Sequence, residues 1–240
     1  SFAVARLAAG LGIDCEQRME LWLAVSSAAL ADCYQALFNM PFPFASVRLT
    51  SDALGSCLGA FGGREGAILI AGTGSARLIY RHGQLHSCSG RGFPISDLGS
   101  GAWLGLRAIQ QSLLCHDGIL PPSLFAVRLL DHFKRDQAEV VRWAARAIPA
   151  DYGRFAPWVF DAASDGDELA NQLLDETCAQ LQTLLEGMRL LGADRIALLG
   201  GVGMRLAPRL GHLNLVPPQA DALEGAILFA QSKAYPCPHP

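Results

Sequence analysis

Three glycine-rich turns, each beside a short apolar segment, constrain the fold of this chain more than any other sequence feature. They are Gly72-Thr73-Gly74-Ser75, the stretch from Gly90 to Gly101, and Gly200-Gly201-Val202-Gly203. Glycine at such a turn lets the backbone approach a ligand closely, and exposed N–H groups there bind phosphate. One turn of this kind is most simply a tight connection. Three of them near the ends of predicted strands favour a nucleotide-binding cleft.

Two common nucleotide motifs are absent from the sequence. No G-x-x-x-x-G-K-[S/T] loop occurs, and Gly201-Val202-Gly203 is not followed by the third glycine of the dinucleotide fingerprint. The P-loop and NAD-binding interpretations are therefore excluded.

Apolar runs separated by turn residues predict alternating strands and helices, which is the pattern of an α/β fold. The predicted strands cover 21–25, 46–50, 67–71, 77–80 and 195–199. The predicted helices cover 29–37, 53–62, 103–115, 122–133, 137–147, 152–163, 168–191 and 221–231. We also expect a helix end within residues 1–10 and a disordered tail at 236–240.

Composition and charge narrow the class of protein further. The chain has 240 residues, 51% of them apolar, and a net charge of −3, so neither a nucleic-acid partner nor an anionic membrane is expected. No apolar run reaches the roughly 20 residues that span a bilayer, and no signal peptide is evident. Seven scattered cysteines without a C-x-x-C pair indicate reduced thiols in a cytoplasmic protein. The six histidines lack ligand spacing, so no metal-ligating residue is assigned.

Two aspartates have both a structural and a chemical interpretation. Asp52 opens a predicted helix, and local sequence favours an N-cap role, although a carboxylate there also suits a general base. Asp97 lies inside the long glycine-rich loop, where it forms an Asx-turn or contacts a substrate or metal.

The order of these motifs resembles a known family. Ser51-Asp52-Ala53, then 71–75, then the loop 90–105 are similar to the N-acetylglucosamine kinase and glucosamine kinase family, with 198–201 and 217–226 fitting as well. The family belongs to the wider BadF/BadG/BcrA/BcrD-type group, which includes the activator ATPase of benzoyl-CoA reductase. The long loop is the specific part of the match.

The resemblance implies an actin-like, ribonuclease H-like α/β fold of two domains, with ATP, Mg²⁺ and an amino sugar meeting in the cleft between them. The expected domains are 1–62, the remainder of the first domain, and 63–235. The resemblance also implies a role for each matching residue. Asp52 would be the catalytic base on the sugar 6-hydroxyl. The expected ATP contacts are Thr73, Gly74, Gly200 and Gly201. The expected sugar contacts are Ser75, Gly90, Gly92 and Asp97.

The chain also departs from the family pattern. A first phosphate hairpin of the form D-G-G-G-T is not found. Leu11-Gly12-Ile13-Asp14 imitates its first half only, so Asp14 is expected to be a surface loop residue and the chain to begin inside the first domain. In the long loop, Arg91 replaces a tryptophan, Leu98 a glutamate, and Ser89 and Ser96 glycines.

These departures leave alternatives open beside the leading interpretation, an ATP-dependent amino-sugar kinase. One alternative is a non-catalytic domain that binds sugar or nucleotide. The other is an activator ATPase, against which the scattered cysteines argue because that branch holds an iron–sulfur cluster. A homodimer is the expected assembly, on the habit of the family.

Overall fold

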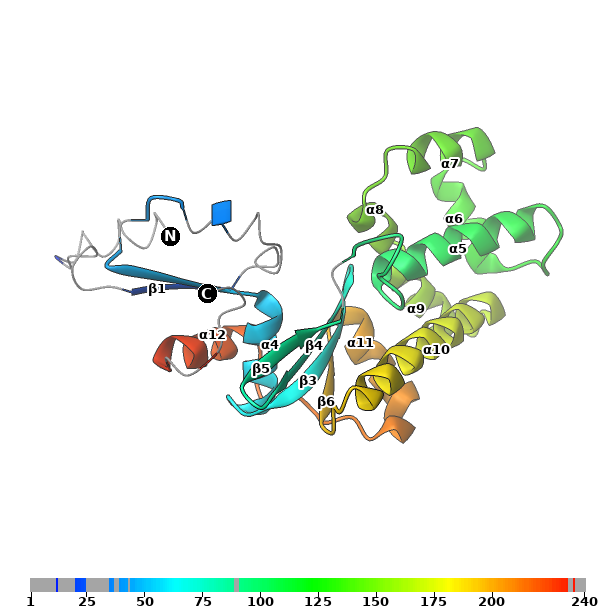
Figure 1. Ribbon diagram of the computed structural model, residues 1–240. Helices are drawn as coiled ribbons and strands as arrows, with labels where there is room; N and C mark the ends of the chain where they lie inside the picture. Colours follow the sequence, from blue (N-terminus) through cyan, green and yellow to red (C-terminus); the bar gives the residue numbers. More distant parts are fainter. Residues whose placement is uncertain are drawn as a thin grey trace. The chain divides into compact units, whose positions relative to one another are not determined.

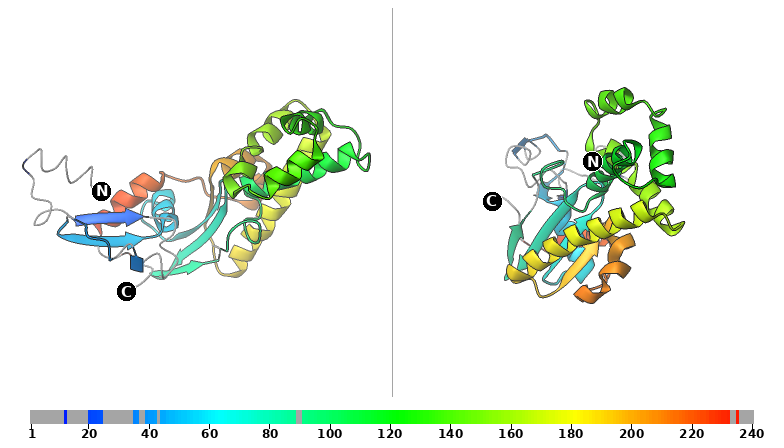
Figure 2. Two further views of the ribbon diagram at one scale, coloured as in Figure 1. Left: turned by 90° about the horizontal axis from the view of Figure 1, so that it is seen from above. Right: turned by 90° about the vertical axis from the view of Figure 1, so that its right-hand side faces the viewer.

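The computed structural model describes residues 12, 20–24, 35–36, 39–42, 44–88, 91–232 and 235 (Figures 1 and 2). The chain divides into two compact units. The first unit comprises 1–68, 78–87 and 217–240, and the second unit comprises 69–77 and 88–216. This division differs from the expected linear boundary at residue 62, because the C-terminal segment returns to the first unit.

The first unit contains a two-stranded parallel sheet and two packed helices. Strand β1 (Glu20–Ala24) pairs with β2 (Ser46–Thr50), which confirms both predicted strands within the described residues. Helix α4 (Asp52–Phe61) packs against α12 (Ala222–Gln231). Small residues allow this close packing: a Cβ on Gly59 would overlap the Asp221 carbonyl, and one on Gly225 would overlap that of Gly55.

A four-stranded sheet has the order β5-β4-β3-β6. Its strands are β3 (Gly66–Ala71), β4 (Ser75–Arg81), β5 (Gln84–Ser87) and β6 (Ile196–Leu199). The turn between β4 and β5 lies at His82-Gly83. Both residues have positive φ, 52° and 71°, as the tight turn of an antiparallel β4–β5 hairpin requires. Strand β5 was not predicted from the sequence because it is short and largely exposed.

Residues 101–213, which belong to the second unit, are mostly helical. The helices are α5 (Gly101–His116), α6 (Leu124–His132), α7 (Gln137–Ala144), α8 (Pro149–Gly153), α9 (Ala156–Ser164), α10 (Glu168–Leu190), α11 (Gly201–Leu206) and the 3₁₀ helix η2 (Ala207–Leu213). Ser100 caps α5 by accepting a hydrogen bond from the Trp103 amide. The apolar stripe of α10 is buried, at Leu173, Leu181, Leu184, Leu185 and Met188.

One predicted helix is wrong. The stretch 152–163 forms two helices, since the chain turns at Arg154–Phe155 and starts α9 afresh. Pro157 lies in the first turn of α9, where its missing N–H removes no hydrogen bond, whereas in a continuous helix it would break one. This restart places Gly153 and Pro157 at the same cavity, described below.

Several sequence predictions lie outside the described residues. They concern the helix end in 1–10, the surface position of Asp14, the loop residues Ser89 and Gly90, and the tail 236–240. Of the predicted helix at 29–37, the structure describes only residues 35–36, which are helical.

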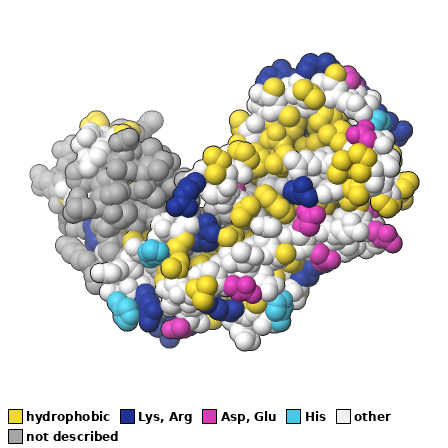
Figure 3. All heavy atoms as spheres, turned by 45° about the vertical axis from the view of Figure 1, so that its right-hand side comes forward, with side chains coloured by type: hydrophobic (Ala, Val, Ile, Leu, Met, Phe, Trp, Pro, Cys, Tyr) yellow, Lys and Arg dark blue, Asp and Glu magenta, His cyan; other side chains and the backbone are white. Residues whose placement is uncertain are grey.

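Figure 3 shows hydrophobic side chains gathered over the helical part of the second unit. Of the helices in the described part of the chain, none is long and apolar enough to cross a membrane.

Candidate functional site

A cavity of about 430 Å³ in the second unit is lined by residues of all three glycine-rich turns, with only the last residue of the long second one, Gly101, taking part. It is lined by Gly72, Thr73, Gly101, Gly153, Ala156, Pro157, Phe160, Gly201, Val202 and Arg205. Its volume is within the range of about 300–1,000 Å³ that is typical of small-molecule sites. Segments from four distant parts of the chain therefore meet at one site.

Backbone hydrogen bonds hold the first turn against the start of α5. The Gly101 amide donates to the Gly72 carbonyl at 2.7 Å, and the Ala102 amide donates to the Thr73 carbonyl at 3.0 Å. Within the turn, the Gly72 amide donates to the Gly74 carbonyl at 3.0 Å. The turn after β3 is thus a defined structure before any ligand binds.

Gly200 positions the turn after β6 for a reason of backbone geometry. Its φ is +85°, and a Cβ there would lie 2.5 Å from the Ala71 carbonyl oxygen. Only glycine combines this conformation with so close an approach to the end of β3. Gly200 therefore joins the turn after β6 to the turn after β3.

Gly72 and Gly201 have no such structural reason to be glycine. Neither has a positive φ, and a Cβ built on either residue meets no atom within 4 Å. Both residues line the cavity. The missing side chains leave open space at the cavity wall, which suits a ligand that approaches the backbone.

The described part of the long loop folds back toward the first turn. Gly92 has a φ of +73°, which glycine tolerates, and its carbonyl accepts a hydrogen bond from the Ser96 amide at 2.8 Å. The Phe93 ring contacts the Tyr152 ring with centroids 5.0 Å apart, so the loop is held against α8. Arg91 is exposed.

Asp97 and Ser75 present polar atoms beside Gly74. A Cβ on Gly74 would lie 2.8 Å from Asp97 Oδ2, so the carboxylate lies directly over this glycine. No side-chain hydrogen bond forms an Asx-turn at Asp97 among the described residues. Ser75 is 7% exposed, and its Oγ has no hydrogen-bond partner in the described part of the chain. A ligand hydroxyl would satisfy this buried group.

Charged side chains lie near Arg77, close to the start of β4. Burial lowers the pKa of the Arg77 guanidinium, and the charge of Arg91 lowers it further, whereas Cys88 and Asp97 raise it. The Asp97 carboxylate thus stabilises a partly buried cation beside the loop.

Asp52 lies in the first unit, and the interpretation of it as the helix N-cap is wrong. The N-cap of α4 is Ser51, whose Oγ accepts a hydrogen bond from the Leu54 amide at 3.2 Å. Asp52 is the first residue of the helix and is exposed. Its carboxylate makes no hydrogen bond or ion pair with a described residue.

The structure brings together most of the residues singled out in the second unit. Thr73 and Gly201 line the cavity, Gly74 and Gly200 adjoin those two residues in the chain, and Ser75 and Asp97 flank Gly74. Phe160 and Arg205 belong to no glycine-rich motif, so the sequence gives no signal that they line the cavity. Within the described ranges, no three His, Cys, Asp or Glu side chains gather as a metal site.

A glycine-lined cavity at the ends of two strands of an α/β sheet defines a nucleotide-binding class of protein. Comparison with known proteins assigns the particular family. The chain belongs to the BadF/BadG/BcrA/BcrD ATPase family, whose sequence model matches residues 5–230.

Individual relatives agree with this assignment. The glucosamine kinase GspK of Vibrio cholerae is 43% identical over 224 residues, which cover 92% of this chain and 76% of GspK. A crystal structure provisionally assigned as an N-acetylglucosamine kinase from Chromobacterium violaceum has a TM-score of 0.80 and 30% identity, covering 94% of this chain and 82% of that one. A second such structure, from Porphyromonas gingivalis, shares the fold with a TM-score of 0.72 at 19% identity, covering 95% and 83% of the two chains. The predicted actin-like α/β fold class is confirmed, and so is the prediction of an enzyme of the sugar-kinase class.

Proposed function

We propose that this protein transfers the γ-phosphoryl group of ATP to the 6-hydroxyl of an amino sugar. The observation that carries the proposal is the cavity at which Gly72 and Gly201 face open space without a conformational or packing reason to be glycine. A nucleotide is the ligand that glycine-rich turns at strand ends accommodate best.

Neighbouring parts of the cavity suit the phosphates and the adenosine of a nucleotide. The phosphates are proposed to bind along the backbone of Gly72, Thr73 and Gly74, since a turn held by its own hydrogen bonds loses little freedom on binding. The adenosine is proposed to lie beside Gly200 and Gly201, at the start of α11.

The amino sugar is proposed to bind at Ser75, Gly92 and Asp97. Ser75 supplies a buried hydroxyl without a partner among the described residues, and Asp97 supplies a carboxylate over Gly74. A carboxylate favours the ammonium group of a free amino sugar. We therefore propose glucosamine as the acceptor, in agreement with the 43% identity to a glucosamine kinase.

In the proposed reaction, Asp52 removes the proton of the sugar 6-hydroxyl. The oxygen attacks the γ-phosphorus, the bond from this phosphorus to the β–γ bridging oxygen breaks, and ADP leaves with that electron pair. The family assignment and the exposed position of Asp52 at the start of α4 support this role. Mg²⁺, which such sites hold through one or two carboxylates and the phosphates themselves, would neutralise phosphate charge.

Asp52→Asn tests the proposal. We expect kcat to fall about 10²- to 10⁴-fold, the usual contribution of a general base, while calorimetry shows glucosamine affinity within about threefold of wild type. Ser51 still caps α4, so the fold is retained. Asp194→Asn, an exposed aspartate before β6, is the matched control and keeps its activity.

The assay measures ADP release with glucosamine and with N-acetylglucosamine as acceptors. A near-normal kcat in Asp52→Asn would contradict the base assignment. ADP release from the wild type that does not depend on either sugar would contradict the kinase itself.

A further inference from the structure

Arg205 gives the cavity one charged side chain in a fixed position. Among the described residues that line the cavity, Arg205 alone is charged. Its Cζ lies 4.1 Å from the centroid of the Phe160 ring, and its Nη2 lies 3.8 Å from Asp161 Oδ1. The guanidinium is thereby stacked on a ring and oriented by a neighbouring carboxylate, although 48% of the side chain is exposed.

The two ends of the cavity are formed by different residues. Its first end is at Gly72 and Thr73, where Gly153 also lies: a Cβ there would be 3.4 Å from Thr73 Cγ2. Gly200, just before α11, touches the backbone of the same turn. Helices α9 and α11 therefore both start at this first end.

Phe160 and Arg205 lie one helical turn further along the two walls. On α9, Phe160 follows Ala156 by four positions, and on α11, Arg205 follows Gly201 by four. Residues four apart share a helix face and are about 6 Å apart along the axis. The stacked pair of Phe160 and Arg205 thus forms the second end of the cavity, opposite the turn after β3.

We propose that Arg205, held on Phe160, is the stacking surface for the base of the nucleotide. This inference rests on the proposed function, which binds the phosphates at the first end and leaves the base to extend toward the second. A guanidinium is planar and weakly hydrated, so it stacks on an aromatic ring with one face and on a purine with the other. Phe160 acts as a positioning residue, because it orients Arg205.

The composition of the cavity walls on α9 and α11 supports stacking over hydrogen bonding as the means of binding the base. Apart from Arg205, the wall side chains on α9 and α11 are apolar, namely Ala156, Pro157, Phe160 and Val202. Flat contact with an apolar wall and a planar cation matches the two faces of a purine. A phosphate group at this position would need hydrogen-bond donors besides Arg205, which these apolar side chains do not supply.

The test measures binding of ADP, adenosine and tripolyphosphate to the whole chain by titration calorimetry. For Arg205→Ala we expect the Kd of ADP and of adenosine to rise at least fivefold, while the Kd of tripolyphosphate changes less than twofold. Arg205→Lys keeps the positive charge but not the planar guanidinium, and is expected to lose as much affinity for ADP as Arg205→Ala. Phe160→Leu keeps an apolar wall but no longer holds the guanidinium in place. Its affinity for ADP is expected to lie between those of the wild type and Arg205→Ala.

The matched control is Arg209→Ala. Arg209 bonds to Asp175 and Asn171 outside the cavity, so ADP affinity stays unchanged in this variant. Equal losses for tripolyphosphate and ADP in Arg205→Ala would overturn the proposal and assign Arg205 to the phosphates. Unchanged ADP affinity in Arg205→Ala would overturn it while leaving the proposed function intact. A wild type that binds no nucleotide would instead overturn the proposed function, and the stacking role with it.

Discussion

At the scale of single residues, Gly200 and Gly201 are neighbours in the chain but are glycine for different reasons. Gly200 has a positive φ and touches the Ala71 backbone, whereas Gly201 faces open space at the cavity wall. We predict that Gly200→Ala lowers the free energy of unfolding by about 2 kcal/mol or more, through strain and overlap. Gly201→Ala keeps or raises stability, since alanine favours a helix.

Nucleotide binding distinguishes the same two variants. In Gly201→Ala the new methyl group occupies the space proposed for adenosine, so the Kd of ADP is expected to rise about tenfold at unchanged stability. Thermal unfolding and calorimetry measure the two properties separately. A loss of stability in Gly201→Ala without a loss of affinity would argue that Gly201 serves the fold and not a ligand.

Cys57 makes the stability of the first unit depend on pH. Its side chain is fully buried in α4 and its Sγ donates to the Gly66 carbonyl at 3.5 Å. Burial raises the pKa of this thiol to about 12. Because the folded state holds the proton more tightly than the unfolded state, the stabilisation is complete below pH 9 and is lost progressively as the pH rises toward 12.

Chemical denaturation at a series of pH values measures this effect. Between pH 9 and pH 10 we expect Cys57 to account for a loss of about 1 kcal/mol in the free energy of unfolding. Cys57→Ala is less stable at neutral pH, since it leaves a cavity, but lacks this component of the slope. The thiols of Cys88, Cys115 and Cys178, whose pKa burial also raises, are present in both proteins and cancel in the comparison. Parallel slopes for the two proteins would contradict the prediction.

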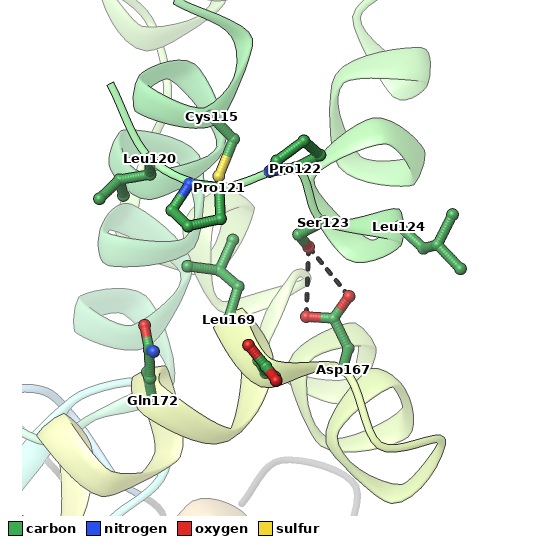
Figure 4. A pocket seen from close by; sticks show the side chains of 10 residues that line it. Cys115, Leu120, Pro121, Pro122, Ser123, Leu124, Asp167, Leu169 and Gln172 are labelled. Carbon is green, nitrogen blue, oxygen red and sulfur yellow. Dashed lines mark hydrogen bonds between the residues drawn. The ribbon is translucent and has the colours of Figure 1, made fainter. Parts of the chain in front are cut away.

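At the scale of elements, one carboxylate joins the starts of two helices. Asp167 caps α10 by accepting from the Ala170 amide at 3.0 Å through Oδ1. Its Oδ2 accepts from the Phe125 amide of α6 at 3.1 Å and from Ser123 Oγ at 2.9 Å. Figure 4 shows the Ser123–Asp167 pair at the edge of a second cavity, of about 230 Å³, beside the start of α10.

We predict that Asp167→Ala destabilises the protein more than the loss of an ordinary cap. Removing a single cap costs about 1 kcal/mol, and the additional bonds to α6 raise the expected loss to about 3 kcal/mol. Asp136→Ala is the matched control, since Asp136 caps α7 through the Ala138 amide and otherwise pairs only with Arg142 of the same helix, in an exposed ion pair of small effect. Urea denaturation of both variants gives the comparison. Equal losses in the free energy of unfolding for the two variants would show that the link between α6 and α10 adds nothing to stability.

At the scale of the whole molecule, the two compact units allow the ligand sites to be located separately. Every residue that lines the cavity belongs to the second unit. Bound ADP is therefore expected to slow amide hydrogen exchange in segments 71–75, 153–160 and 200–206. A ligand at 100 times its Kd stabilises the state it binds by about 2.7 kcal/mol, or roughly 100-fold in exchange through global unfolding.

Exchange measured by mass spectrometry, with and without ADP, tests this prediction. The Gly201→Ala variant is the control, because its protection is expected to need about tenfold more ADP. Protection confined to the first unit, for example to β1 and β2, would contradict the placement of the nucleotide in the cavity.

Much of the fold was predictable because it depends on residues close together in the chain. Apolar runs identified β2, β3 and β6. The errors also have local causes. The α8–α9 break depends on Pro157 starting a new helix, and the role of Asp52 was misjudged because Ser51, one residue earlier, takes the N-cap position.

The sequence by itself determined the strands, most of the helices and the three glycine-rich turns, since propensity, capping and turn conformation are set within a few neighbouring residues. Only the tertiary structure decided which glycines face a cavity. Gly200 and Gly201 look alike in the sequence, and the approach of Ala71 to one of them separates their roles. The pairing of Arg205 with Phe160 was likewise decided by packing, because a contact between distant segments leaves no periodic or local signal in the chain.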